Sequence, residues 1–381
     1  MRVGIVTYDF DPPIGGLGVI CKQVKSTLKK LYPGDSYVVL SPSTRSDDRV
    51  SKVAMFRWSK PGGCPIFSLI LFFKLNFLIR KHKLDLLHVH SGSGGVFLLR
   101  KPLCPVVVTA HHTYLQEAEI VFAHSHPKRL WKTFMATLEK RTYAIADSIT
   151  CVSRDTADFL EHRYCVPRSK ITVIENAVHD FCVHDHHKRE SQSLLFIGRL
   201  EERKGIWTLL KAMEILHLSH PNLRLRLIGR NLLGNSLWNF IEKKNLQKCI
   251  TVLGHVHDPL MKRELASATM LVVPSLLEGF GLVAADAMAS GTCVVVSDAP
   301  GLRSIVTHHE TGLIFKTGNV MDCSRVIAEA IDRPDLRNRI AEKAKREAMH
   351  RFSLQERAKD YHALFERAYR TTFVCKSHIL P

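Results

Sequence analysis

The sequence predicts an α/β protein made of two doubly wound halves, each a parallel sheet covered by helices. The chain has 381 residues, of which 45% are hydrophobic. Since a domain usually holds roughly 100 to 200 residues, this length favours two domains with separate cores. Short β-branched runs alternate with amphipathic stretches along nearly the whole chain, which is typical of strands alternating with covering helices. A polar, aperiodic stretch from Asn176 to Gln192 divides this alternation in two.

Six strands are expected in the first half, each a short run rich in apolar and β-branched residues. They are Arg2–Tyr8, Tyr37–Ser41, Leu86–His90, Val106–Ala110, Ser148–Val152 and Ile171–Ile174. Amphipathic periodicity predicts helices between them. These helices are Val19–Leu31, Ile66–His82, Lys128–Ala146 and Asp155–Arg163.

The second half repeats the pattern. Its expected strands are Leu194–Ile197, Leu225–Ile228, Ile250–Leu253, Met270–Val273 and Cys293–Ser297. Its expected helices are Ile206–His217, Leu237–Lys244, Lys262–Ala266, Leu282–Ala289 and Val320–Ile331, followed by charged helical sequence from Asp335 to about Thr371. We therefore expect an N-terminal domain over residues 1–178, a linker over 179–192, a second domain over 193–350, and a C-terminal helix over 351–381 that packs back toward the N-terminal domain.

Composition excludes several classes of protein. This apolar content excludes a disordered chain, and the densest apolar stretch, Ile66–Phe73, is interrupted by Lys74 and Asn76, well short of the roughly 18 residues that span a bilayer. We expect no signal peptide. The ten cysteines are scattered without a CxxC pair, which favours a reduced, cytoplasmic chain. Lys and Arg exceed Asp and Glu by 18, but no reading helix or aromatic-basic motif accompanies them, so we expect no nucleic acid partner.

The loop after the first strand is rich in glycine. Gly15-Gly16-Leu17-Gly18 opens a helix, where backbone N–H groups can approach a phosphate closely. A simple tight turn would look the same. Asp9 and Asp11 spell DxD, the pattern of a metal-bridged nucleotide-sugar site, although two acids beside a turn are common.

Charged side chains follow two strands of the second half. Arg199 and Lys204 follow the first of these strands and precede a helix, where they could hold a diphosphate; a solvated basic loop is the alternative. Glu278 lies in a later strand-to-helix loop with Gly279 and Gly281, and Asp286 lies in the helix that follows. Carboxylates that could bind sugar and ribose hydroxyls, next to backbone amides that could bind phosphate, predict a nucleotide-sugar pocket. Taken alone, Glu278 is more simply explained as an acid that caps a helix.

Read together, these segments resemble the family 4 retaining glycosyltransferases, whose GT-B fold has two facing Rossmann-like domains with a cleft between them. The similarity covers most of the chain and rests on the order and spacing of many short motifs. They are Pro13 with Gly15-Gly16 and Gly18; His88-Val89-His90; Thr109-Ala110-His111; Val173-Ile174-Glu175-Asn176; Gly198-Arg199-Leu200 with Lys204-Gly205; Ile228-Gly229; Gly254-His255-Val256; Pro274-Ser275; and the block from Glu278 to Asp286.

The resemblance implies a retaining, metal-independent, hexosyltransferase-type enzyme that moves a sugar from a nucleoside-diphosphate sugar to a hydroxyl of a glycan or lipid-linked acceptor, with no cofactor. The residues that it implies in catalysis are His111, Arg199, Lys204 and Glu278. Those that it implies in donor binding are Gly16, Val256, Gly279, Phe280, Gly281, Leu282 and Asp286.

By this resemblance, Arg199 and Lys204 would neutralise the leaving diphosphate, which preorganised cations can do without reorganising during the reaction. Glu278 would hold sugar hydroxyls, His111 would lie beside the reacting sugar, and Asp286 would bind the ribose. The leaving phosphate would accept the proton of the attacking hydroxyl.

The sequence departs from the family pattern at several positions. The second acid of the block is usually Glu, but here it is the shorter Asp286; Ala177 replaces a usual Gly, and Ser304 stands where an acid is common. These departures leave open a non-catalytic GT-B-fold protein that binds a nucleotide or glycan.

Two further features carry open alternatives. His179, Cys182, His184, His186 and His187 could ligate a metal, but their spacing is irregular and they lie in the expected linker. The stretch from Ile66 to Lys83 is apolar and then basic, so it could lie peripherally on an anionic, cytoplasmic membrane face; an ordinary covering helix has the same pattern.

Overall fold

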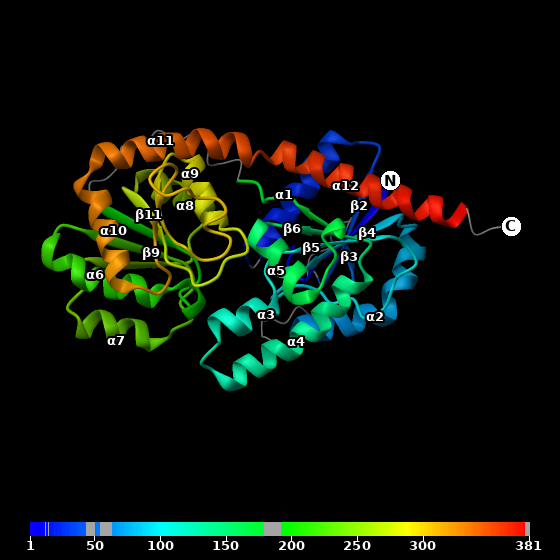
Figure 1. Ribbon diagram of the computed structural model, residues 1–381, viewed down its shortest axis with the longest axis horizontal. Coiled ribbons are helices and arrows are strands. Elements are labelled where there is room, and N and C mark those ends of the chain that lie inside the picture. Colours follow the sequence, from blue (N-terminus) through cyan, green and yellow to red (C-terminus); the bar gives the residue numbers. More distant parts are fainter. Residues whose placement is uncertain (12, 14, 43–49, 54–62, 179–191, 378–381) are drawn as a thin grey trace. The chain divides into compact units, whose positions relative to one another are not determined.

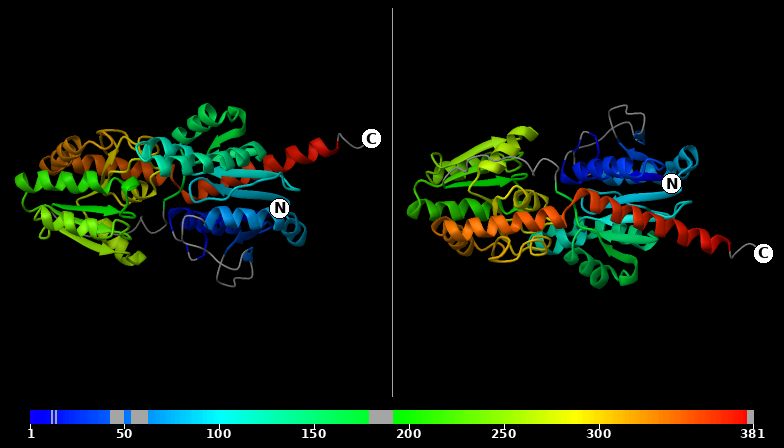
Figure 2. Two further views of the ribbon diagram at one scale, coloured as in Figure 1. Left: turned by 90° about the horizontal axis from the view of Figure 1, so that it is seen from below. Right: turned by 90° about the horizontal axis from the view of Figure 1, so that it is seen from above.

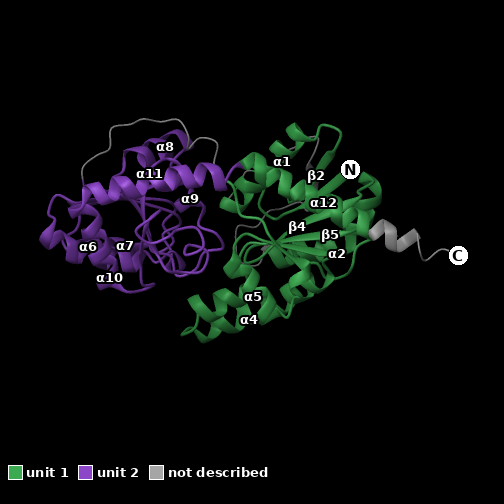
Figure 3. Ribbon diagram, turned by 45° about the horizontal axis from the view of Figure 1, so that its top comes forward, with its two compact units in different colours: residues 1–177, 354–381 green, residues 178–353 purple. Residues whose placement is uncertain are grey.

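The computed structural model describes residues 1–11, 13, 15–42, 50–53, 63–178 and 192–377 (Figure 1). The chain divides into two units (Figure 3). Unit 1 comprises Met1–Ala177 and Leu354–Pro381, and unit 2 comprises Val178–Ser353. Each unit contains one parallel sheet with its own hydrophobic core, so each is described separately.

The sheet of unit 1 has seven parallel strands in the order β3-β2-β1-β4-β5-β6-β7. They are β1 (Arg2–Val6), β2 (Ser36–Ser41), β3 (Val50–Lys52), β4 (Leu86–Ser91), β5 (Val106–Ala110), β6 (Ser148–Cys151) and β7 (Ile171–Val173). Every residue of β4 and β5 is buried, which explains their continuous apolar character, because helices cover both faces of such a sheet.

The helices of unit 1 lie in two layers. They are α1 (Gly16–Leu31), α2 (Gly63–His82), α3 (Tyr114–Gln116), α4 (His126–Ile145), α5 (Arg154–Tyr164) and α12 (Leu354–Ser377), with a π-helix over Glu117–Val121 after α3. The C-terminal α12 lies along α1 and contacts β4 and β5 (Figure 2). Right-handed crossovers place α2 and α4 on the opposite face of the sheet (Figure 1).

The sheet of unit 2 has six parallel strands in the order β10-β9-β8-β11-β12-β13. They are β8 (Ser193–Ile197), β9 (Arg224–Ile228), β10 (Ile250–Gly254), β11 (Met270–Val273), β12 (Cys293–Ser297) and β13 (Leu313–Phe315). Its helices are α6 (Ile206–Ser219), α7 (Asn235–Lys243), α8 (Asp258–Ser267), α9 (Leu282–Ala289), α10 (Val320–Asp332) and α11 (Pro334–Arg351). The doubly wound architecture expected for both halves is confirmed.

Several elements differ from the expectation. The edge strands β3 and β13 and the turn formed by α3 and the π-helix were not predicted, because segments of three to five residues carry too little periodicity. The helical sequence after Asp335 forms two helices, α11 and α12, which are interrupted at Phe352, a fully buried side chain. The expected linker over 179–192, with its histidines and Cys182, lies outside the described residues except for Gln192.

Candidate functional site

In unit 2, the loops that follow β8 and β11 carry a cluster of opposite charges. The Lys204 Nζ lies 2.5 Å from Oε1 of Glu278, and the Ser275 hydroxyl donates to the same oxygen at 2.8 Å. Since β8 and β11 are neighbours in a parallel sheet, their carboxyl ends bring residues 74 positions apart into contact. This is the edge of a doubly wound sheet where ligands bind.

Arg203 connects this pair to the rest of the basic loop. Its Nη1 donates to the Leu277 carbonyl at 2.9 Å and lies 3.7 Å from Oε2 of Glu278, and its Nη2 lies 3.2 Å from Glu201. Glu201 also pairs with Arg199 at 3.0 Å. Arg199, Lys204 and Glu278 therefore belong to one network, in which the Arg199 side chain remains 54% exposed and accessible to a ligand.

The network and its burial shift the pKa values of Glu278 and Lys204. Burial alone would raise the pKa of Glu278, but Lys204 and Arg203 outweigh it and lower that pKa to about 2. Burial lowers the pKa of Lys204, and this effect is opposed by Glu278. Glu278 is thus an anion at neutral pH that can accept hydrogen bonds from sugar hydroxyls.

Glycines allow the two loops to approach each other. Gly205 has φ +64°, and a Cβ there would lie 1.7 Å from the Pro274 carbonyl oxygen. The Leu276 N–H donates to the Arg203 carbonyl at 2.8 Å, which ties the loops together beside this contact. Packing therefore requires glycine at the position after Lys204. The close approach of the two loops in turn sets the position of the lysine.

The predicted donor-binding residues of the Glu278 block lie at the beginning of α9. Gly279 and Phe280 precede Gly281, which has φ +98° and caps the helix that starts at Leu282. The Phe280 ring is buried edge-to-face against the Phe352 ring, with 5.3 Å between the ring centroids. Only the backbone of Phe280 is therefore suited to contact a ligand. The amides of this segment form a helix N-terminus, which favours an anion.

Asp286 and Val256 are placed less directly for a ligand. Asp286 lies in the second turn of α9 and is only 5% exposed. Val256 is half-buried in the loop between β10 and α8, also after the carboxyl end of a strand. Their roles in donor binding stay predictions.

In unit 1, Gly16 is the first residue of α1 and is exposed. Oδ2 of Asp9 accepts the N–H groups of Gly15 at 2.9 Å and Gly18 at 3.2 Å. A Cβ at Gly18 would lie 2.7 Å from the Asp9 carboxyl, so this carboxylate explains one glycine of the loop. A phosphate bound at this helix N-terminus would have to share the backbone N–H donors with Asp9.

The DxD pattern has a structural explanation. Asp9 binds the backbone of α1, and Asp11 pairs with Lys22 at 3.3 Å. Within the described ranges, no three His, Cys, Asp or Glu side chains are grouped so that they could hold a metal ion.

His111 follows β5 and ends a chain of buried histidines. Its Nε2 lies 3.0 Å from Nδ1 of His90, and Nε2 of the neighbouring His88 lies 2.7 Å from the Thr109 hydroxyl. Burial, with a smaller effect of nearby His112, lowers the pKa of His111 to about 3, and burial together with His111 lowers that of His88 to about 3. All the ring contacts are therefore made by neutral imidazoles at ordinary pH. The sequence showed His88 and His90 alternating on a strand, but not the bond from His90 to His111.

A second charged cluster beside His111 was missed from the sequence. Buried Glu117 lies 3.2 Å from Nε2 of His112, accepts the Ser93 hydroxyl at 2.7 Å and pairs with Lys132. Burial opposes its ionisation, but His112 and Lys132 hold the pKa of this carboxyl well below its usual range. Glu117 belongs to the unpredicted π-helix, so no periodic pattern marked it.

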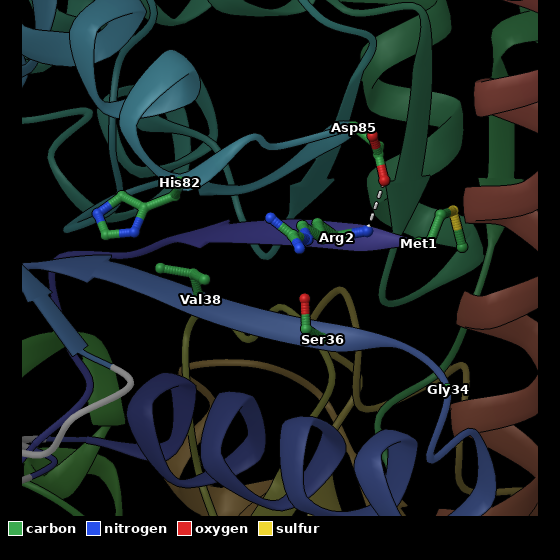
Figure 4. Close-up of a pocket in the computed structure, with 7 residues that line it drawn as sticks. All are labelled: Met1, Arg2, Gly34, Ser36, Val38, His82 and Asp85. Carbon is green, nitrogen blue, oxygen red and sulfur yellow. Dashed lines mark hydrogen bonds between the residues drawn. The ribbon is translucent and has the colours of Figure 1, made fainter.

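The pocket drawn in Figure 4 lies elsewhere. It has a volume of about 480 Å³ and is lined by Met1, Arg2, Gly34, Ser36, Val38, His82 and Asp85. These residues surround the amino ends of β1 and β2, at the opposite end of the sheet from Gly16 and His111. The site is therefore defined by the strand ends and not by this pocket.

Comparison with known proteins gives these strand-end motifs a family. Residues 184–347 match the family model for glycosyl transferases group 1, and residues 14–180 match that for Glycosyltransferase Family 4. The chain belongs to glycosyltransferase family 4. An uncharacterized glycosyltransferase of Methanocaldococcus jannaschii is 25% identical over 94% of this chain and 96% of its own length.

Solved structures of other proteins share the fold. Sucrose-phosphate synthase of Thermosynechococcus elongatus superposes with a TM-score of 0.82 at 19% identity, covering 97% of this chain and all of the other. The Anabaena protein HepE, solved in complex with UDP-glucose, superposes with a TM-score of 0.72 at 17% identity, covering 96% and 100%. The expected GT-B fold of this family 4 glycosyltransferase is confirmed.

Proposed function

We propose that this family 4 glycosyltransferase transfers a hexosyl group, with retention and without a metal, from a nucleoside-diphosphate sugar to a hydroxyl of a glycan or lipid-linked acceptor. The observation that carries the proposal is the contact of Lys204 with Glu278 at the ends of β8 and β11. The nucleotide-sugar donor is further supported by the complex of HepE, a protein of the same fold, with UDP-glucose.

Lys204 is suited to act on both halves of such a donor. An ammonium group has three N–H donors, so Lys204 can keep its bond to Glu278 and bind a phosphate oxygen as well. Glu278 would then hold the sugar hydroxyls beside the bond that breaks. As that bond breaks, negative charge grows on the diphosphate, where Lys204 and the exposed Arg199 would stabilise it in place of a metal ion.

The acceptor side would be provided by the strand ends of unit 1. His111 is neutral, so we do not assign it the role of a cation; its imidazole is held by His90 and would contact the sugar as a hydrogen-bonding group. In the proposed reaction the acceptor oxygen forms the new bond to the anomeric carbon, the bond to the diphosphate breaks, and the acceptor proton passes to the leaving phosphate.

A donor must first be named by binding. A thermal-shift screen of nucleoside diphosphates and their sugars suits this purpose, because a ligand at about 100 times its Kd stabilises the folded state by about 2.7 kcal/mol. Turnover is then measured with that donor.

We predict that Lys204→Ala and Glu278→Gln each lower turnover at least about a hundredfold, since each removes a preorganised group that contacts the reacting donor. Exposed neighbours provide matched controls. Lys211→Ala on α6 and Glu202→Gln beside Lys204 should keep wild-type turnover. If either site variant retained wild-type turnover, the site would be wrongly assigned.

A non-catalytic nucleotide-binding protein is the second candidate, favoured by the shortened acid Asp286 in its buried position. Such a protein would give thermal shifts with nucleotides but would never release a nucleoside diphosphate from the sugar donor.

A further inference from the structure

Helix α2 has two apolar faces, only one of which packs on the core. Leu71 and Leu75 are buried on the inner face. The exposed apolar side chains recur at intervals of three or four residues, which places them in one stripe along the helix. They are Ile66 (43% exposed), Leu69 (52%), Phe73 (71%) and Phe77 (66%). A covering helix of a globular domain would carry polar side chains on this outer face.

Helix α4 has an exposed apolar group of its own. Leu130 is 68% exposed, Trp131 45% and Phe134 56%, and the Trp131 and Phe134 rings lie 6.2 Å apart. These three side chains precede the residues by which α4 packs on the core, which are Met135, Ala136, Glu139, Thr142 and Tyr143.

The two helices lie on the same face of the sheet of unit 1, opposite α1 and α12 (Figure 1). The segment between Leu98 and Lys101 links them. Arg100 stacks over the Phe72 ring of α2 at 4.8 Å, and Arg141 of α4 donates to the Leu99 carbonyl at 3.4 Å. The two helices therefore flank one short segment.

Exposed cations accompany these apolar groups. They are Lys74, Arg80 and Lys81 on α2 and Lys128, Arg129, Lys140 and Arg141 on α4. The only carboxylate in the two helices is Glu139, which is fully buried. None of the seven cations pairs with a carboxylate of the residues that the structure describes. The surface of both helices is thus apolar and uniformly positive.

We propose that this α2–α4 surface, made of the seven exposed apolar side chains and the seven cations, binds the surface of an anionic lipid bilayer. Large aliphatic and aromatic side chains would enter the headgroup region, and the lysines and arginines would bind lipid phosphates. Lysine is depleted at protein–protein interfaces, whereas four of the seven cations of this surface are lysines. The proposal does not depend on the proposed transfer reaction, because none of these residues belongs to the donor cluster.

The test is co-sedimentation of the purified full chain with vesicles, which needs neither donor nor turnover. Vesicles of phosphatidylcholine alone are compared with vesicles that also contain phosphatidylglycerol. The wild-type protein should sediment with the anionic vesicles, and added salt should weaken this binding because the screening length shortens. Phe73→Ser with Phe77→Ser, and separately Arg80→Gln with Lys81→Gln, should each lower the partition coefficient about tenfold.

The matched control removes exposed apolar side chains from unit 2. Leu218 is 86% exposed and Met321 is 66% exposed, so Leu218→Ser with Met321→Ser should bind vesicles as wild type does. Trp131→Ser with Phe134→Ser gives a second test on α4 if the α2 variant does not fold. Equal binding of wild type to both kinds of vesicle, or unchanged binding by the apolar variants, would overturn the proposal. The proposal would also be overturned if this surface held two copies of the chain together. In that case ultracentrifugation would show a wild-type dimer that the Phe73 and Phe77 changes dissociate, and the wild type would not bind vesicles.

Discussion

Arg203 is the side chain that joins the loop of Lys204 to the loop of Glu278. It is 9% exposed, and its guanidinium contacts Glu201, Glu278 and the Leu277 carbonyl. It need not touch the donor, so we regard it as a positioning residue. A planar fork with five N–H donors can hold three acceptors at once, which a lysine cannot do in the same geometry.

Replacing Arg203 by Met keeps much of the apolar stem but leaves the Leu277 carbonyl without this donor. We predict a loss of about 1–3 kcal/mol in the free energy of unfolding, and a fall of about tenfold or more in kcat/KM, because Glu278 loses one of the cations that hold it ionised. Arg203→Lys should recover part of the activity. Wild-type kinetics for Arg203→Met would show that the arginine does not position Glu278.

The buried histidines predict how stability depends on pH. The pKa values of His88 and His111 lie near 3 in the folded protein, and that of His90 is well below its usual value. Between about pH 6.5 and pH 3 these three histidines therefore bind more protons in the unfolded chain than in the folded one, so their contribution lowers stability as the pH falls. The loss is about 2 kcal/mol per histidine at about pH 5.

Thermal unfolding between about pH 7 and pH 5 measures this dependence. His88→Gln should lower stability at neutral pH but make its fall on acidification shallower, with His124→Gln, an exposed histidine, as the control. If His88→Gln left the dependence of stability on pH unchanged, this histidine would not be held neutral by burial.

Single residues show where sequence reasoning succeeds and where it stops. Apolar runs placed Arg199, Lys204 and Glu278 at strand ends, and the family resemblance supplied their expected roles. Strands β8 and β11 do bring Lys204 and Glu278 together. The bond of Arg203 to Leu277 and that of His90 to His111 depend on side-chain directions across neighbouring strands. No local pattern encodes those directions.

At the level of elements, the turn after β8 depends on a close backbone approach. Gly205→Ala would combine a positive φ with a Cβ placed 1.7 Å from the Pro274 oxygen. We predict a loss of at least about 2 kcal/mol in the free energy of unfolding, together with lower turnover, because the two loops must separate.

Gly318→Ala is the control for this change. Gly318 has a similar φ of +74°, but no atom lies within 4 Å of the added Cβ, so this variant carries the backbone strain without the collision. Chemical denaturation of both variants separates the two effects. Equal losses of stability would show that the contact with Pro274 is not what requires glycine.

The elements also differ in how well they were predicted. Strands such as β5 and β12 are buried throughout and appear as uninterrupted apolar runs. The π-helix with Glu117 and the strands β3 and β13 are short, and the sheet or a buried ion pair stabilises them more than local sequence does. The pairing of Glu117 with Lys132 could therefore be recognised only from the structure.

Across the whole chain, sequence alone predicted two parallel α/β units, and the fold and family comparisons confirm them. None of the described helices combines the length and the apolarity that crossing a bilayer would require. The excess of 18 positive charges, unexplained by the few cations of the donor cluster, is accounted for in part by the α2–α4 surface.

The central claim is that the chain cleaves a nucleoside-diphosphate sugar by means of Lys204 and Glu278 without a metal. The most direct measurement is NMR of acceptor-free donor cleavage in the presence of EDTA, with the donor identified by thermal shift. We predict slow release of the nucleoside diphosphate by the wild-type protein, initial formation of the sugar with the anomeric configuration of the donor, and no release by Lys204→Ala. Binding without release, release that stops when metal is removed, or an inverted product would contradict the account.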